Sequence, residues 1–260
     1  MRLEDAFSVI SSSIDYASRI QRAILPDDTI FQAMFAEHFI IWQPRDRVGG
    51  DMYWIRAWGD GVLLIVADCT GHGVPGAFMT LIATGALDRA QDDVSPGKPG
   101  ALVQRMHQLV QLTLGQHTDQ GESDDGLELG AVYVDSDTTH LIFTGARFDL
   151  FHFDGDAAQV IKGTKQGIGY RRVPFGQTYD ETMVTIAPDS RYYMTSDGLI
   201  DQVGGARKRS FGKKRFKQLL SEIKDLPMSE QKERIEEALS TYQGSEKRRD
   251  DVSMVGFKAS

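Results

Sequence analysis

The first 25 residues carry apolar side chains in the repeat of an amphipathic helix. Apolar positions recur there at alternating steps of four and three residues, which is the spacing of a heptad seam. The seam has one polar member, Gln21, and Pro26 ends it. The pattern predicts a helix over residues 1–25. The seam positions are Leu3, Phe7, Ile10, Ile14, Ala17, Gln21 and Ile24.

Two interpretations of this helix stay open. It can pack on the body of its own chain, or it can join a second copy or an upstream sensor domain in a longer protein. Tyr16, Ile20 and Ala23 form a second apolar stripe beside the seam, and two adjacent faces allow one helix to contact two partners. We therefore divide the chain into a linker or dimerisation helix, residues 1–26, and a second domain, residues 27–260.

The rest of the chain alternates short β-type runs with helical segments. Short apolar runs bounded by turn residues predict strands, and longer stretches of helical period predict helices. Strands are expected at residues 39–42, 61–67, 127–134, 139–145, 148–153, 157–161, 181–186, 191–196 and 251–258, and helices at residues 73–89, 101–114, 213–224 and 228–242. Asp154-Gly155 predicts a hairpin turn. This order of elements predicts an α+β fold, with helices flanking an antiparallel β-sandwich.

Composition narrows the function classes. The chain has 260 residues, of which 41% are hydrophobic and 25% charged, as in an ordinary globular protein with a sizeable core. A formal net charge of −8 argues against wholesale nucleic-acid binding. The single cysteine, Cys69, excludes an internal disulfide. No apolar run approaches the ~20 residues of a membrane helix, and the N-terminus lacks a signal-peptide pattern. We expect a cytoplasmic protein, or the cytoplasmic output domain of a larger membrane-anchored sensor.

Four aspartates lie at strand ends or in glycine-rich turns, far apart in the sequence. They are Asp51, Asp68, Asp197 and Asp250. A glycine beside an acid lets the backbone approach a ligand closely or adopt a positive φ, and carboxylate oxygens suit hard divalent cations. A single Asp-Gly after a strand is usually a turn, but the four acids together predict a metal site.

The acids belong to four short motifs. The motifs are Val48-Gly49-Gly50-Asp51, Ala67-Asp68-Cys69-Thr70-Gly71-His72-Gly73, Thr195-Ser196-Asp197-Gly198 and Asp250-Asp251-Val252-Ser253. In this order and spacing they resemble the PPM family of metal-dependent protein serine/threonine phosphatases. The chain is similar to the bacterial branch that includes the stage II sporulation protein E phosphatase and the sigma-B activator phosphatases. The resemblance covers about residues 20–258.

The resemblance implies a site for two Mn²⁺ or Mg²⁺ ions at one end of the sandwich. By position, Asp68 is expected to bridge both ions, and the backbone carbonyl of Cys69 to bind the second. Asp197 and Asp250 are expected to bind the first ion. Asp51 is expected to bind the second ion directly or to hold one of its waters.

The implied activity is hydrolysis of phosphoserine or phosphothreonine on a small regulatory protein of the anti-sigma-factor-antagonist type. Two divalent cations offset roughly four negative charges and activate a water for in-line attack on phosphorus. One alternative is a non-catalytic pseudophosphatase that binds phosphoproteins as a signalling module. A histidine-kinase-like ATPase is a third hypothesis, but the spacing within residues 68–73 does not fit its Asp-x-Gly-x-Gly motif.

Two functional residues of the family, the candidate general acid and the phosphate-binding arginine, have no clear counterpart in the motifs. In eukaryotic relatives a histidine two positions after the bridging aspartate is a candidate general acid, and Thr70 stands there in this chain. His72 lies two positions further on, and we expect it to shape the turn. Asp251 is expected behind the metal ligands. No clear match exists for the phosphate-binding arginine of the family, and Arg45 and Arg47 are expected to be exposed.

A basic segment follows the third motif. Two interpretations of this segment stay open: a solvated helix face, or a docking surface for an acidic partner. Its members are Arg207, Lys208, Arg209, Lys213, Lys214, Arg215 and Lys217.

Overall fold

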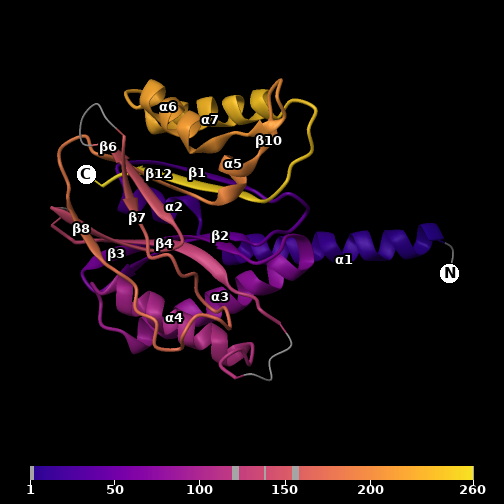
Figure 1. The fold of residues 1–260 in the computed structure, drawn as a ribbon, viewed down its shortest axis with the longest axis horizontal. Coiled ribbons are helices and arrows are strands. Elements are labelled where there is room, and N and C mark those ends of the chain that lie inside the picture. The colour runs from indigo at the N-terminus through magenta and orange to yellow at the C-terminus, as the bar shows by residue number, and fades with distance from the viewer. Residues whose placement is uncertain (1–2, 119–122, 138, 154–157, 260) are drawn as a thin grey trace.

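Two five-stranded antiparallel sheets stacked on each other form the centre of the molecule. The computed structural model describes residues 3–118, 123–137, 139–153 and 158–259 (Figure 1). The first sheet contains, in spatial order, β1 (Glu37–Gln43), β12 (Val252–Lys258), β9 (Arg191–Thr195), β6 (Asp149–Phe153) and β7 (Gln159–Lys162). The second sheet contains β2 (Asp51–Trp58), β3 (Gly61–Cys69), β4 (Leu127–Val134), β5 (His140–Ala146) and β8 (Thr182–Thr185). The predicted antiparallel β-sandwich is confirmed.

Helices cover both outer faces of the sandwich. The helices of the described residues are α1 (Leu3–Ile24), α2 (Asp28–Met34), α3 (Gly73–Asp93), α4 (Pro99–Thr113), α5 (Asp197–Asp201), α6 (Gly212–Ile223) and α7 (Met228–Gln243). α3 and α4 pack on the second sheet, and α6 and α7 pack on the first (Figure 1). A two-stranded hairpin of β10 (Val203–Gly204) and β11 (Arg209–Ser210) precedes α6.

Strand β3 shows how the layers are held together. Leu63 and Ile65 point to the side of the second sheet that α3 and α4 cover. Leu64 and Val66 point to the other side and join the core between the two sheets. All four side chains are fully buried. Because both faces of this strand are covered, its sequence is a continuous apolar run rather than an alternating one.

The predicted helices and strands of the body are present, with ends shifted by a few residues. The sequence pattern did not predict β2, α2, α5 or the β10–β11 hairpin. In β2 the run from Met52 to Ile55 is apolar with no polar alternation, because most of the strand is buried. α2 is short, and the side chain of Asp27 caps it by accepting a hydrogen bond from the Thr29 N–H at 2.8 Å. The turn predicted at Asp154-Gly155 lies outside the described residues.

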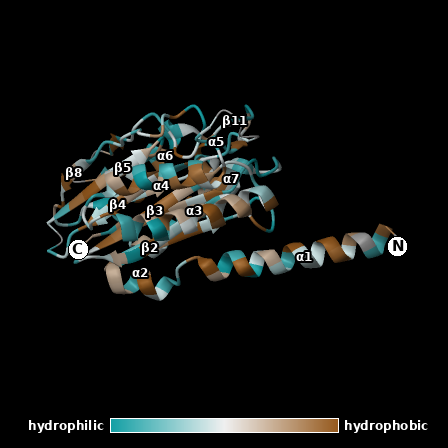
Figure 2. Cartoon of the chain, turned by 90° about the horizontal axis from the view of Figure 1, so that it is seen from below, coloured by the Kyte–Doolittle hydropathy of each residue, from teal (hydrophilic) through white to brown (hydrophobic). Residues whose placement is uncertain are grey.

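The N-terminal helix α1 extends away from the body (Figures 1 and 2). Its outer part exposes large apolar side chains, with Leu3 87%, Phe7 72% and Ile10 60% exposed. The polar member of the predicted seam, Gln21, is buried against the body instead. The inner part of α1 therefore packs within its own chain. Across the described part of the chain, no helix has the length and apolarity needed to cross a membrane.

Candidate active site

Three acidic residues lie side by side across the strand ends of the second sheet. Asp51 at the start of β2 is directly opposite Asp68 on β3, and Asp68 is directly opposite Glu128 on β4. Residues that face each other across antiparallel strands share one side of the sheet. Here that side is the one turned toward the first sheet, since Val66 on the same face of β3 belongs to the core between the sheets. The row of acids therefore lies at the open end of the sandwich.

The first sheet supplies the opposite wall. β9 ends at Thr195, and Asp197 begins the short helix α5 directly afterwards. Asp250 and Asp251 stand immediately before β12, which pairs with β9. The segment that follows β9 and the segment that precedes β12 are therefore adjacent in space, although more than fifty residues separate them in sequence. Strand pairing in both sheets is what gathers the four motifs.

Asp51 connects the two sheets through hydrogen bonds to serines. The hydroxyls of Ser196 and Ser253 donate to its Oδ2 at 2.6 and 2.8 Å. The Ser253 N–H in turn donates to the Ser196 hydroxyl at 3.0 Å. Asp51 is only 2% exposed, so this network holds its carboxyl group behind the cavity rather than within it.

Asp251 stabilises the loop before Asp51 through hydrogen bonds to its backbone. Its two carboxylate oxygens accept hydrogen bonds from the backbone N–H groups of Arg45 and Gly50, both at 2.6 Å. A β-carbon at Gly50 would lie 2.4 Å from the carbonyl oxygen of Gly71, within the second motif. The glycine is therefore required for close backbone contact between the first two motifs. The expectation that Asp251 stands behind the ligands stays a prediction.

Burial and mutual repulsion shape the protonation of the acids. Burial raises the pKa of Asp68 to about 10, and the neighbouring charges of Asp51 and Asp197 add to the effect. Burial also raises the pKa of Asp51 to about 7, although the two serine hydroxyls act against it. The pKa of Asp197 is raised by burial and by the nearby Asp201. Burial and the neighbouring carboxylates therefore both disfavour the ionised forms of these acids.

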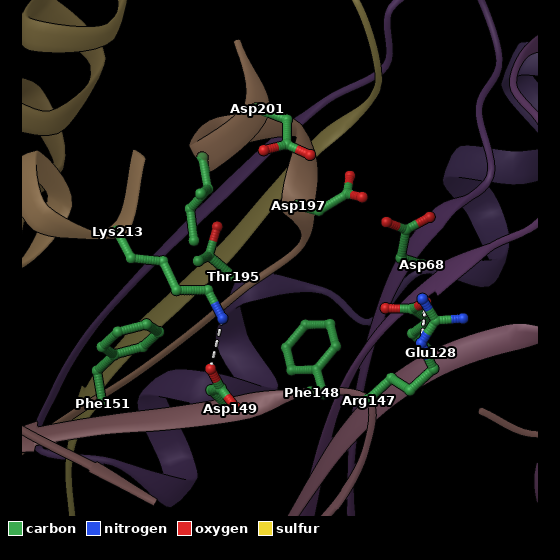
Figure 3. A pocket seen from close by; sticks show the side chains of 11 residues that line it. Asp68, Glu128, Arg147, Phe148, Asp149, Phe151, Thr195, Asp197, Asp201 and Lys213 are labelled. Carbon is green, nitrogen blue, oxygen red and sulfur yellow. Dashed lines mark hydrogen bonds and ion pairs between the residues drawn. The ribbon is translucent and has the colours of Figure 1, made fainter. Parts of the chain in front are cut away.

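A small cavity of about 140 Å³ opens between the acids of the two walls (Figure 3). Asp68 and Asp197 line it, and their carboxyl groups point toward each other. Asp250 does not line the cavity, but it is close enough for its charge to raise the pKa of both residues. The thiol of Cys69 is buried in the core under α3 and α4, and its pKa is raised by burial. A Cβ at Gly50 would lie 2.7 Å from the Cys69 carbonyl oxygen.

The donor set fits a hard divalent cation. It consists of carboxylate oxygens and a backbone carbonyl, the ligands that Mg²⁺ and Mn²⁺ prefer. Burial, with the neighbouring carboxylates, raises the pKa of Asp51 and Asp68, and a bound cation would favour their ionised forms. Among the described residues, however, no three Asp, Glu, His or Cys side chains converge in the arrangement of a formed metal centre. The Asp51 carboxyl group is instead hydrogen-bonded by Ser196 and Ser253.

The cavity also contains residues that the sequence reading did not single out. Glu128, Arg147, Asp149 and Asp201 line it, together with Lys213 from the predicted basic segment. Lys213 Nζ lies 2.7 Å from Asp149 Oδ2, and Lys162 Nζ lies at the same distance from that oxygen. No short motif marks Glu128 or Arg147. Only the register of β3, β4 and β5 brings them beside Asp68.

The residues weighed as a general acid or phosphate ligand lie elsewhere. His72 precedes α3, its side chain is 44% exposed, and its Nδ1 lies 3.2 Å from Asp46 Oδ2. Arg47 is paired with Asp15 of α1 and also donates to the Ser11 carbonyl oxygen at 3.2 Å. Arg45 donates to the Arg249 carbonyl oxygen at 3.2 Å. None of the three lines the cavity.

Comparison with known proteins identifies similar domains. A sequence profile of the stage II sporulation protein E (SpoIIE) family matches residues 59–260. The chain is similar to the SiaA-PP2C domain of Pseudomonas aeruginosa, with 38% sequence identity, 97% of this chain and 98% of that chain covered, and a TM-score of 0.89. No curated protein matches the chain.

More distant structures share the fold. The RsbU and RsbW domains of a Mycobacterium tuberculosis protein align at 18% identity, covering 85% of this chain and 60% of that chain, with a TM-score of 0.63. RsbX in complex with magnesium aligns at 13% identity, covering 84% of this chain and 92% of that chain, with a TM-score of 0.53. At this identity the similarity establishes the fold alone.

Proposed function

The chain belongs to the SpoIIE family of PP2C-type serine/threonine phosphatase domains, and on this premise we propose that divalent cations bind where its acidic motifs meet. The cations are two Mn²⁺ or Mg²⁺ ions. The proposed ligands are the side chains of Asp68, Asp197 and Asp250 and the backbone carbonyl of Cys69. Asp51 would bind an ion directly or hold one of its waters. The proposed substrate is phosphoserine or phosphothreonine on a regulatory partner protein, similar to an anti-sigma-factor antagonist.

The observation that supports this site is the meeting of Asp68 with acids from both sheets. Asp51 lies directly opposite it in the second sheet, and Asp197 faces it from the first sheet across the cavity (Figure 3). A central carboxylate with acids on two sides is suited to bridging two ions. The presence of magnesium in the related fold of RsbX supports Mg²⁺ as one of the candidates.

The residues around the acids prepare the site for phosphate hydrolysis. When bound, divalent cations supply the Lewis acidity for attack of water on phosphorus. The serine hydroxyls fix the orientation of Asp51 by donating to one of its oxygens. Phe148 and Phe151 supply apolar rings to the lining of the cavity. The chain offers no Ser-His-Asp arrangement among the described cavity residues, so direct hydrolysis fits better than a covalent intermediate.

A regulatory protein as substrate is consistent with the domains found beside this fold in similar structures. RsbU and RsbW domains share one chain in the similar Mycobacterium tuberculosis structure. We extend the proposal to a linker helix at residues 1–26 and a phosphatase domain at residues 27–260. The exposed apolar face of α1 would form a homodimer or meet an upstream sensor domain. The cytoplasmic location stays a prediction.

The experiment that tests the function uses a phosphoserine peptide and the purified chain. We expect release of inorganic phosphate with Mg²⁺ or Mn²⁺ and no release with excess chelator. A non-catalytic pseudophosphatase would bind the peptide under the same conditions without releasing phosphate. Binding without turnover, at metal concentrations shown by calorimetry to saturate the protein, would replace the enzyme with that alternative.

A further inference from the structure

Arg147 occupies a fixed turn at the mouth of the cavity. It lies in the two-residue connection between β5 and β6, where the chain passes from the second sheet to the first. Its φ of 55° is in the left-handed region, which is uncommon for a residue other than glycine. The Arg147 N–H donates to the Thr164 carbonyl oxygen at 2.8 Å, and the Thr164 N–H donates to the Gly145 carbonyl oxygen at 2.8 Å. Two hydrogen bonds with Thr164 therefore hold the backbone of this turn.

The side chain of Arg147 is directed along the row of acids. Its Nε lies 3.0 Å from Glu128 Oε1, and Glu128 is the residue directly opposite Asp68. Figure 3 shows the guanidinium beside Glu128 and below Asp68. The Arg147 side chain is 53% exposed and that of Glu128 is 25% exposed, so the ion pair is partly open to solvent. Such exposed pairs add little to stability, and the left-handed backbone is itself unfavourable. Stability alone gives no reason for an arginine here.

The charges around the cavity point to a role in binding an anion. Asp68, Glu128, Asp149, Asp197 and Asp201 all line it. Of the two cationic side chains in the described lining, Lys213 is paired with Asp149 at 2.7 Å. Arg147 is the one beside Asp68, and its charge acts on Asp197 as well. A phosphoryl group entering between these acids therefore meets the Arg147 guanidinium.

We propose that Arg147 binds the phosphoryl oxygens of the substrate, and that Glu128 positions its guanidinium. A guanidinium has five N–H donors in a planar fork, and the ion pair with Glu128 uses Nε. The two Nη groups can then contact two phosphoryl oxygens in the bidentate manner that arginine favours. The inference rests on the proposed function, because it assigns the substrate contact of the same site. It also places the phosphate-binding arginine on a turn between strands rather than at Arg45 or Arg47.

The test separates phosphoryl binding from turnover. Arg147→Asn removes the guanidinium while keeping a residue type that tolerates the left-handed backbone. Arg147→Lys keeps the charge without the fork, and Glu128→Gln keeps an acceptor without the charge. Arg56→Ala is the matched control, because Arg56 also forms an exposed ion pair at a strand, with Asp88 at 3.2 Å, away from the cavity. Inorganic phosphate binding is measured by calorimetry at constant Mg²⁺, and KM and kcat are measured with para-nitrophenyl phosphate.

Loss of a bidentate contact to a charged group corresponds to about a 10- to 100-fold weaker affinity. We expect Arg147→Asn to raise the dissociation constant of phosphate and the KM by that factor, with a smaller change in kcat. Arg147→Lys and Glu128→Gln should give intermediate values, and Arg56→Ala should match the wild type. Equal phosphate binding by the wild type and Arg147→Asn, or no phosphate binding by the wild type, would overturn the inference. Absence of turnover in a wild type that still binds phosphate through Arg147 would instead count against the proposed function.

Discussion

The side-chain amide of Gln21 makes a paired hydrogen bond with the backbone of Gly49. Its Nε2 donates to the Gly49 carbonyl oxygen at 2.7 Å, and its Oε1 accepts from the Gly49 N–H at 3.2 Å. The same Nε2 also donates to the Thr80 hydroxyl of α3 at 3.1 Å. Because Gly49 is two residues before Asp51, the N-terminal helix is tied to the loop that positions one of the acids.

Replacing this amide is expected to loosen the site. Gln21→Ala leaves buried backbone groups of Gly49 without partners, which costs about 1–3 kcal/mol for each unsatisfied group. The Asp51 loop should then be less well placed, so the metal concentration for half-maximal activity should rise. The matched control is Gln32→Ala, because Gln32 makes an exposed side-chain hydrogen bond to Asp28 in α2. An unchanged metal requirement in Gln21→Ala, with the expected loss of thermal stability, would limit this contact to a structural role.

The outer part of α1 is expected to associate with a second copy. Leu3, Phe7 and Ile10 in this part are 87%, 72% and 60% exposed, and they form an apolar face that a second copy can cover. Brown, hydrophobic residues recur along α1 in Figure 2. Ile10→Asp should therefore shift the chain toward monomer in sedimentation analysis over a concentration series. Ser12→Asp is the control, since Ser12 is also exposed on α1 but outside the predicted seam. A wild type that is monomeric throughout the series would contradict self-association.

The close backbone contact at Gly198 is expected to be indispensable. A β-carbon there would lie 1.8 Å from the carbonyl oxygen of Asp251, a backbone atom that cannot turn aside. Gly198→Ala should therefore destabilise the fold and displace Asp197, which begins the same helix. Gly85→Ala is the control, because a β-carbon at Gly85 meets nothing within 4 Å in the middle of α3. That change should stabilise the protein by about 0.5–1 kcal/mol. Equal melting temperatures for the two variants would refute the requirement for glycine at position 198.

The protonation of the acids predicts a dependence of metal binding on pH. Burial raises the folded-state pKa of Asp51 to about 7 and that of Asp68 to about 10. Without metal, the folded state therefore holds more protons than the unfolded state between about pH 4 and about pH 10, and its stability should fall as pH rises through this range. Binding of Mg²⁺ or Mn²⁺ requires the ionised acids, so it should release protons and strengthen with pH. Calorimetric titrations in two buffers with different ionisation enthalpies measure this release, and no difference between the buffers would contradict it.

Sequence motifs were sufficient to predict the sandwich and to point to Asp68 and Asp197, which do line one cavity. They were not sufficient for what depends on strand register. β2 was not predicted, although its run from Met52 to Ile55 is apolar, and so the cross-strand pairing of Asp51 with Asp68 was not foreseen. Glu128 and Arg147 stand in no motif and reach the cavity through the pairing of three strands. Gln21 had the pattern of a seam position between helices, whereas its hydrogen bonds are to Gly49 and Thr80 of its own chain.

The proposed metal site depends most directly on Asp68, the acid between the two walls. The decisive measurement is turnover of para-nitrophenyl phosphate at saturating Mn²⁺ by Asp68→Asn, with Asp88→Asn as the control because Asp88 is exposed on α3. Changing residues behind metal ligands typically costs about 10- to 100-fold in affinity or activity, so loss of a bridging ligand should cost more than about 100-fold. The account predicts that loss in Asp68→Asn, an intact fold by circular dichroism, and normal turnover in Asp88→Asn. Turnover by Asp68→Asn within a few-fold of the wild type would contradict it.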